Sequence, residues 1–255
     1  MPTWPAVVLF AAIAGAASLI GVWLMWGHQT WARRHTPELI TFASGLLVAG
    51  SLLHLFTRSG DMIGSGKSMA WGLAAFILLY IAENHFLPHP HARAEGDEGE
   101  AHHDHPEHVG WVAILGLALH SLMDGLAVGA GFSASLLTGG VILALVVSHK
   151  LPVGIATMSV LYHGGMERRE AVRYAIAVAL VTPVAVLVSF GALRDAGPSL
   201  LGIFLAAAGG SFLYVGAADL LPEGQASGRR RNTAAFLLGV VVMILGLMLV
   251  RGGGH

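Results

Sequence analysis

The chain has 255 residues, of which 55% are hydrophobic and 11% are charged, and its mean hydropathy is +0.69. A soluble domain of this length is much less apolar, so the composition predicts a membrane protein. The net charge of −1 gives no overall field that would favour nucleic acid as a partner, and the absence of cysteine excludes disulfides and thiolate metal ligands.

Eight apolar runs, each long enough to cross a lipid bilayer, predict an all-α polytopic membrane protein. We expect the helices at about residues 5–26, 38–57, 69–87, 110–132, 137–161, 171–193, 199–221 and 233–250. Eight spans use nearly the whole chain, so residues 1–255 should form a single transmembrane domain. The first run lacks a preceding basic segment, because the first charged residue is Arg33, and we assign it as a helix rather than a signal peptide.

Basic residues are unevenly distributed between the two sets of loops. If the N-terminus lies outside, the outer loops and tail hold four, Arg58, Lys67, Arg194 and Arg251. The inner loops then hold nine, Arg33, Arg34, Arg93, Arg168, Arg169, Arg173, Arg229, Arg230 and Arg231. By the positive-inside rule, both termini should face outside and the loop at 88–108 should be cytoplasmic. We expect the membrane to be the cell (inner) membrane.

The second and seventh predicted helices share a spacing. Gly45 precedes His54-Leu55 by nine residues, and Gly210 precedes Asp219-Leu220 by the same interval. Helices 1 to 3 begin outside and helices 6 to 8 begin inside, so the two triplets would be inverted repeats around helices 4 and 5. The identity is slight, but it favours a 3+2+3 transporter arrangement.

Polar residues at matching depth in helices 4 and 5 are the candidate metal ligands. His120 and Asp124 are four residues apart, which places them on one helical face, and His149 lies about as far into the next helix, beside Lys150. A single intramembrane histidine commonly bridges two helices by a hydrogen bond, whereas four such residues together favour a site. A buried Asp124 needs a cation, which a divalent ion or Lys150 would supply.

Two imidazoles and a carboxylate suit Zn(II) and are also acceptable to Fe(II), Mn(II) or Cd(II). The strings HSLMDG at 120–125 and HKLPVG at 149–154 resemble the paired signatures of the ZIP (Zrt/Irt-like) metal transporters. FASG at 42–45, the His54-Leu55 pair and the stretch 212–223 resemble the family's second and seventh helices. The helix 5 stretch is most similar to the branch known from eukaryotic Golgi membranes. We expect transport by alternating access around helices 4 and 5, and the resemblance implies a homodimer.

Four positions depart from the pattern of ZIP members that bind two metals. Where those members carry asparagine or an acid, this chain has Ser121, Lys150, Val153 and Thr182. We infer that the Lys150 ammonium stands where a second metal would lie, which leaves a single transported ion.

Three further residues are candidates for the transport path. His54 lies near the outer end of its helix and is either a fourth ligand or a waypoint on the outer side. Glu83 and Asp219 lie near the inner ends of their helices. They mark an exit path or are helix-end carboxylates that meet water.

The loop at 88–108 is rich in histidine and acidic residues. Its histidines are His89, His91, His102, His103, His105 and His108. The low hydrophobicity predicts a flexible segment, and histidine tracts bind metal weakly and reversibly. The loop either collects or senses zinc on the inner side or is a solvated linker.

Residues 64–68, GSGKS, are similar to a nucleotide-binding loop, but the glycine that this motif requires at position 61 is Asp61. We assign the segment to an outer loop and expect no nucleotide partner.

Taken together, these features favour a zinc carrier that moves the ion toward the cytoplasm. Two alternatives are an intramembrane hydrolase, with zinc-activated water or Ser121 as nucleophile, and a metal sensor that does not transport.

Overall fold

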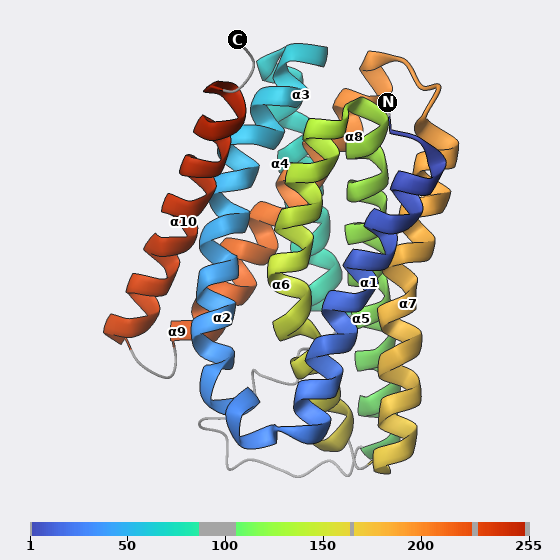
Figure 1. Ribbon diagram of the computed structural model, residues 1–255, viewed down its shortest axis with the longest axis vertical. Helices are drawn as coiled ribbons and strands as arrows, with labels where there is room; N and C mark the ends of the chain where they lie inside the picture. Colours follow the sequence, from blue (N-terminus) through green and yellow to red (C-terminus); the bar gives the residue numbers. More distant parts are fainter. Residues whose placement is uncertain (1, 87–105, 164–165, 226–228, 253–255) are drawn as a thin grey trace.

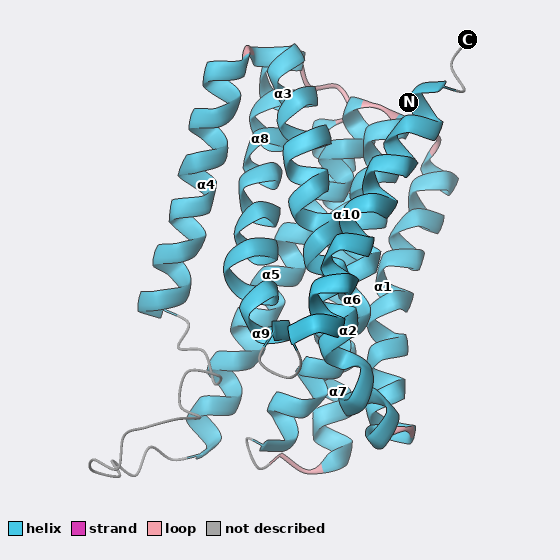
Figure 2. Cartoon of the chain, turned by 90° about the vertical axis from the view of Figure 1, so that its left-hand side faces the viewer, coloured by secondary structure: helices cyan, strands magenta, loops and turns pink. Residues whose placement is uncertain are grey.

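The computed structural model describes residues 2–86, 106–163, 166–225 and 229–252, and within these ranges all regular structure is helical (Figure 2). The elements in chain order are α1 (Trp4–Gly27), α2 (Gln29–Gly50), the π-helix η1 (Ser51–Leu55), α3 (Phe56–Ile63), α4 (Ser65–Phe86), α5 (Pro106–Ala134), α6 (Leu136–His163), α7 (Arg168–Leu193), α8 (Pro198–Tyr214), the π-helix η2 (Val215–Leu220), α9 (Leu221–Gln225) and α10 (Arg229–Gly252).

Eight helical stretches in the described part of the chain are long and apolar enough to cross a membrane, which confirms the predicted all-α class and the number of spans. Two of them are composite, because α2, η1 and α3 run continuously, as do α8, η2 and α9. The start of α1 and the end of α10 lie at the same end of the bundle (Figure 1). That this end faces outside stays a prediction.

The second span is longer than predicted. It begins at Gln29 and passes through Pro37, where we expected the helix to start after the proline. Hydropathy detects only the apolar part of a helix, so the polar first turns were missed. Pro37 removes the single hydrogen bond that its own N–H would donate, and the helix continues on both sides of it.

The outer loop predicted at 64–68 is reduced to one residue. Gly64 alone separates α3 from α4, and its φ of +86° lies in the left-handed region that favours glycine. The Ser68 hydroxyl donates to the carbonyl of Phe56 and holds the two helices together. The glycines and Lys67 therefore form a tight turn and the start of a helix.

The predicted inner loop ends earlier than 108. Helix α5 begins at Pro106, so the backbone of His108 belongs to the helix. His89, His91, His102, His103 and His105 lie outside the described residues. Their proposed metal capture stays a prediction.

The helices pack in two groups. In the first group, α1 packs against α6 and α7, and α5 packs against α6 and α7. A Cβ at Gly21 would lie 2.2 Å from the carbonyl oxygen of Leu151, and one at Gly154 would lie 2.2 Å from that of Ser18. Because these glycines lack side chains, the backbones of α1 and α6 touch directly, as small residues permit between membrane helices.

The second group consists of α2, α3, α4, α8 and α10. It has its own glycine contacts, since a Cβ at Gly45 would meet the Phe236 carbonyl and one at Gly210 would meet that of Gly72. Helix α4 stands at the edge of this group and buries little of its surface (Figure 2).

The two groups meet chiefly where α2 packs against α6 and where α8 packs against α5. Side chains fill this boundary, as the Leu145 side chain does opposite Gly50. The face of α6 that carries His149 adjoins α8, because the rings of His149 and Phe212 lie 6.1 Å apart.

Candidate metal site

Helix α5 presents His120 and Asp124 on one face, as their spacing predicted. Nε2 of His120 lies 3.3 Å from Oδ2 of Asp124. Asp124 is buried, while the His120 side chain keeps 24% of its surface exposed. The carboxylate is therefore enclosed, and His120 keeps more of its side-chain surface exposed than Asp124 or His149, although its Nε2 is buried.

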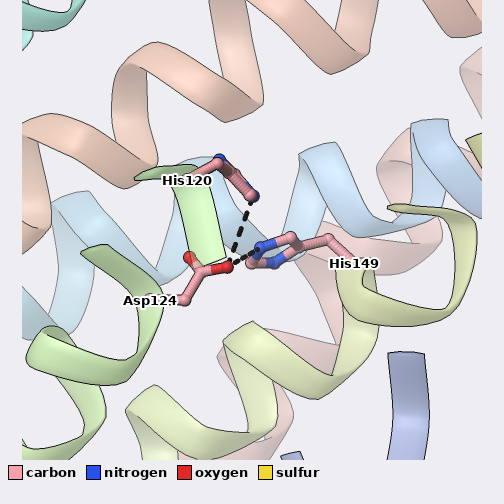
Figure 3. A group of neighbouring side chains, drawn as sticks. All are labelled: His120, Asp124 and His149. Atoms are coloured by element: carbon pink, nitrogen blue, oxygen red, sulfur yellow. Dashed lines mark hydrogen bonds and ion pairs between the residues drawn. The ribbon is translucent and has the colours of Figure 1, made fainter. Parts of the chain in front are cut away.

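Helix α6 contributes His149, which is fully buried. Its Nδ1 lies 2.9 Å from the carbonyl oxygen of Leu145, one helical turn earlier. Because a carbonyl only accepts, Nδ1 is the donor, and this bond orients the ring. Nε2 then points to Asp124 and lies 3.2 Å from the same Oδ2 that faces His120 (Figure 3).

The three ligand atoms all lie within 4.8 Å of one another. In a neutral His149 ring, donation from Nδ1 leaves a lone pair on Nε2, which faces a carboxylate oxygen that is also an acceptor. The buried Nε2 of His120 likewise finds no hydrogen-bond partner among the described residues. Imidazole nitrogens and a carboxylate oxygen that converge in this way could share a divalent cation.

Two of the three distances between these atoms match a tetrahedral ion, and the two nitrogens lie within 4.8 Å of each other. Ligand atoms about 2.0 Å from zinc lie about 3.3 Å apart along a tetrahedral edge. The two nitrogen-to-Oδ2 distances, 3.2 Å and 3.3 Å, match that edge. The group could therefore hold a zinc ion after small adjustments of the side chains.

Lys150 completes the charge balance. Its side chain is 0% exposed, and Nζ lies 2.9 Å from Oδ2 of Asp124. Nζ also donates to Oγ of Ser121 over 2.9 Å. The backbone carbonyl of Ser121 accepts from the Thr182 hydroxyl, which connects α7 to the site. Thus three of the four positions that depart from the two-metal pattern form one hydrogen-bonded set.

His54 does not join the three-residue group within the described chain. It lies in η1, is 7% exposed, and lines a cavity of about 420 Å³. Thr57, Arg58 and Asp61 line the same cavity, as do Ser135 and Thr138 from the junction of α5 and α6. This position argues against His54 as the fourth ligand. Asp61 is a further residue of this cavity, and its spacing of seven residues from His54 is the sequence signal of a shared helical face.

Glu83 and Asp219 come together around Tyr214. The Tyr214 hydroxyl hydrogen-bonds to Glu83, and Asp219 lies within electrostatic range of it. Asp219 lies in η2, just as His54 lies in η1, so each π-helix holds one of the two polar residues paired by spacing in the sequence. Such π-helical turns are often found at functional sites.

A family model described as ZIP zinc transporter matches residues 81–250, more than half of the chain. The chain belongs to this family. The membership confirms the predicted family, which is described as one of zinc transporters.

Several curated relatives are similar to this ZIP chain. Zinc transporter ZIP10 of Homo sapiens is 37% identical over 116 residues, 45% of this chain and 14% of ZIP10. Zinc transporter ZIP9 of Micropogonias undulatus is 31% identical over 157 residues, 55% of this chain and 51% of ZIP9. The metal cation symporter ZIP8 of Rattus norvegicus is 30% identical over 146 residues, 54% of this chain and 30% of ZIP8. The chain thus spans about half or less of the length of these relatives.

Proposed function

We propose that this ZIP chain carries zinc toward the cytoplasm by alternating access, through a single-metal site made by His120, Asp124 and His149. The observation that carries the proposal is the convergence of two imidazole nitrogens on Oδ2 of Asp124 at tetrahedral spacing. The names of the ZIP10 and ZIP9 relatives support zinc as the cargo. Fe(II), Mn(II) and Cd(II) accept the same donors and are the competitors to test.

In this proposal Lys150 limits the site to one ion. Its ammonium is close enough to Asp124 to repel a second dication, and Ser121 and Thr182 offer hydroxyls where two-metal members carry stronger ligands. Equilibrium dialysis should therefore find one zinc per chain in the helical domain. Two ions bound there by the unmodified protein would contradict the proposal.

Alternating access is supported by the position of the site. His120, Asp124 and His149 lie on helices of the first group, at the boundary with α8 of the second group. A relative shift of the groups would expose the site to one side and then the other. The two π-helices, at equivalent intervals in spans two and seven, agree with a 3+2+3 inverted repeat.

We place the cavity around His54 on the outer side and the carboxylates of Glu83 and Asp219 on the inner, exit side. The ion would pass from one to the other by way of His120. In this orientation both termini lie outside and the histidine-rich loop lies in the cytoplasm, where it would receive the ion. A homodimer in the cell (inner) membrane completes the proposal.

Reconstituted liposomes loaded with a zinc-sensitive dye test the carrier function. His120→Ala removes one of three ligands, and we expect the initial rate of zinc uptake to fall at least about tenfold. His28→Ala is the matched control, because His28 is exposed between α1 and α2. Equal uptake by the unmodified protein and His120→Ala would overturn the carrier proposal. Binding of zinc without uptake by the unmodified protein would indicate a sensor instead.

The outer cavity leads to a separate prediction. Replacing both His54 and Asp61 with alanine removes two zinc-attracting side chains upstream of the site. We expect the zinc concentration for half-maximal uptake to rise several-fold, because the local ion concentration falls, while the maximal rate stays near that of the unmodified protein. A fall in maximal rate with an unchanged half-maximal concentration would instead assign His54 to the central site.

A further inference from the structure

One oxygen atom of Asp124 is shared by three nitrogen groups. Nζ of Lys150, Nε2 of His149 and Nε2 of His120 lie 2.9 Å, 3.2 Å and 3.3 Å from Oδ2. The shortest of these contacts is the one to the ammonium. An ion that binds both imidazoles and Oδ2 therefore competes with Lys150 for this oxygen.

The Lys150 ammonium has a second hydrogen-bond acceptor, which it keeps when its contact with Asp124 is broken. Nζ donates to Oγ of Ser121 over 2.9 Å, and the Ser121 backbone is held by the Thr182 hydroxyl of α7. Lys150 and Ser121 are 0% and 1% exposed, so the ammonium and its second acceptor are both enclosed by protein. Nζ contacts both oxygens at once, so an ammonium that releases Oδ2 still has the Ser121 hydroxyl as its acceptor.

We propose that Lys150 is a tethered exchange cation: its ammonium neutralises Asp124 whenever zinc is absent and yields Oδ2 to zinc when the ion arrives. This inference rests on the proposed carrier function and extends it. When zinc binds, the counter-charge of Asp124 changes from the single charge of the Lys150 ammonium to the double charge of a mobile ion. The empty site can then reorient with its carboxylate paired, without a second ion to accompany it, because an unpaired carboxylate in the membrane interior is costly.

The exchange has two opposite consequences for zinc. The ammonium competes for Oδ2 and weakens binding, since only the fraction of sites with a released carboxylate is ready for the ion. The same ammonium speeds the return of the empty carrier. Removing the charge should therefore tighten binding and slow net transport at once, a combination that damage to a ligand does not produce.

The test uses Lys150→Met in the full chain, with Lys150→Arg as the variant that keeps the charge. We expect Lys150→Met to bind zinc about tenfold more tightly in equilibrium dialysis. In liposomes its net uptake should fall at least about tenfold, because the empty site must return with an unpaired carboxylate. Exchange of radioactive zinc against internal zinc should persist, because the site is loaded in both directions.

Ser121→Ala is the second variant, and it remains informative if Lys150→Met fails to fold. It removes the acceptor that holds the displaced ammonium, so zinc should bind more weakly, opposite to the effect of Lys150→Met. Unchanged zinc affinity in whichever variant folds, or an equal loss of exchange and net uptake in Lys150→Met, would overturn the exchange role. If the unmodified protein shows neither exchange nor net uptake, the carrier function itself fails.

Discussion

Replacing Asp124 with asparagine should abolish measurable zinc binding and lower the free energy of unfolding by about 3 kcal/mol. The substitution keeps the shape of the side chain but removes the charge on which His120, His149 and Lys150 converge. The loss of stability arises because the fully buried Lys150 ammonium is left without its counter-ion. Equilibrium dialysis measures the first effect, and unfolding in detergent measures the second.

The double variant Asp124→Asn with Lys150→Met is the matched control. It removes both charges, so most of the lost stability should return while zinc binding stays absent. If Asp124→Asn were as stable as the unmodified protein, the contact between Lys150 and Asp124 would not act as a buried ion pair. Full zinc affinity in the double variant would exclude Asp124 as a ligand.

Replacing Gly154 with alanine should be about as damaging to stability, although it adds a single methyl group. The new Cβ would lie 2.2 Å from the carbonyl oxygen of Ser18, so α1 and α6 must separate. We expect a loss of about 3 kcal/mol in the free energy of unfolding, since backbone atoms on both sides leave no flexible side chain to yield. Thermal unfolding of the purified protein in detergent gives the measurement.

The same variant should also weaken zinc binding, because Gly154 lies about one turn beyond Lys150 on the helix that carries His149. Gly140→Ala provides the comparison within α6, where a Cβ would meet nothing within 4 Å. Its effect on stability should be neutral or slightly favourable, by up to about 1 kcal/mol, because alanine favours the helix. Similar behaviour of the two variants would show that the close contact of α1 and α6 is unimportant for stability.

Much of the architecture follows from the amino-acid sequence. The eight spans were predicted because the preference of each apolar run for lipid is local and nearly additive along the chain. The shared face of His120 and Asp124 follows from the period of the α-helix. The family resemblance rested on the same short motifs in helices 4 and 5 and was confirmed by the family match.

Helix ends were less predictable. A hydropathy profile does not detect the polar helical turns before Pro37. It also does not predict that Gly64, in the left-handed conformation, replaces the expected loop. These features depend on local hydrogen bonds and on contacts with neighbouring helices, to which a hydropathy window is insensitive.

The arrangement around Asp124 was decided by the tertiary structure. Sequence spacing places Lys150 at the right depth, but the packing of α5 against α6 directs its ammonium to Oδ2 of Asp124 and to Ser121. The same packing leaves His54 lining a cavity with Asp61, apart from the group of His120, Asp124 and His149. The depth of a residue in the membrane depends on its own helix alone. Whether its side chain points toward another helix depends on which helix faces pack together. Contacts between residues far apart in the chain determine that packing.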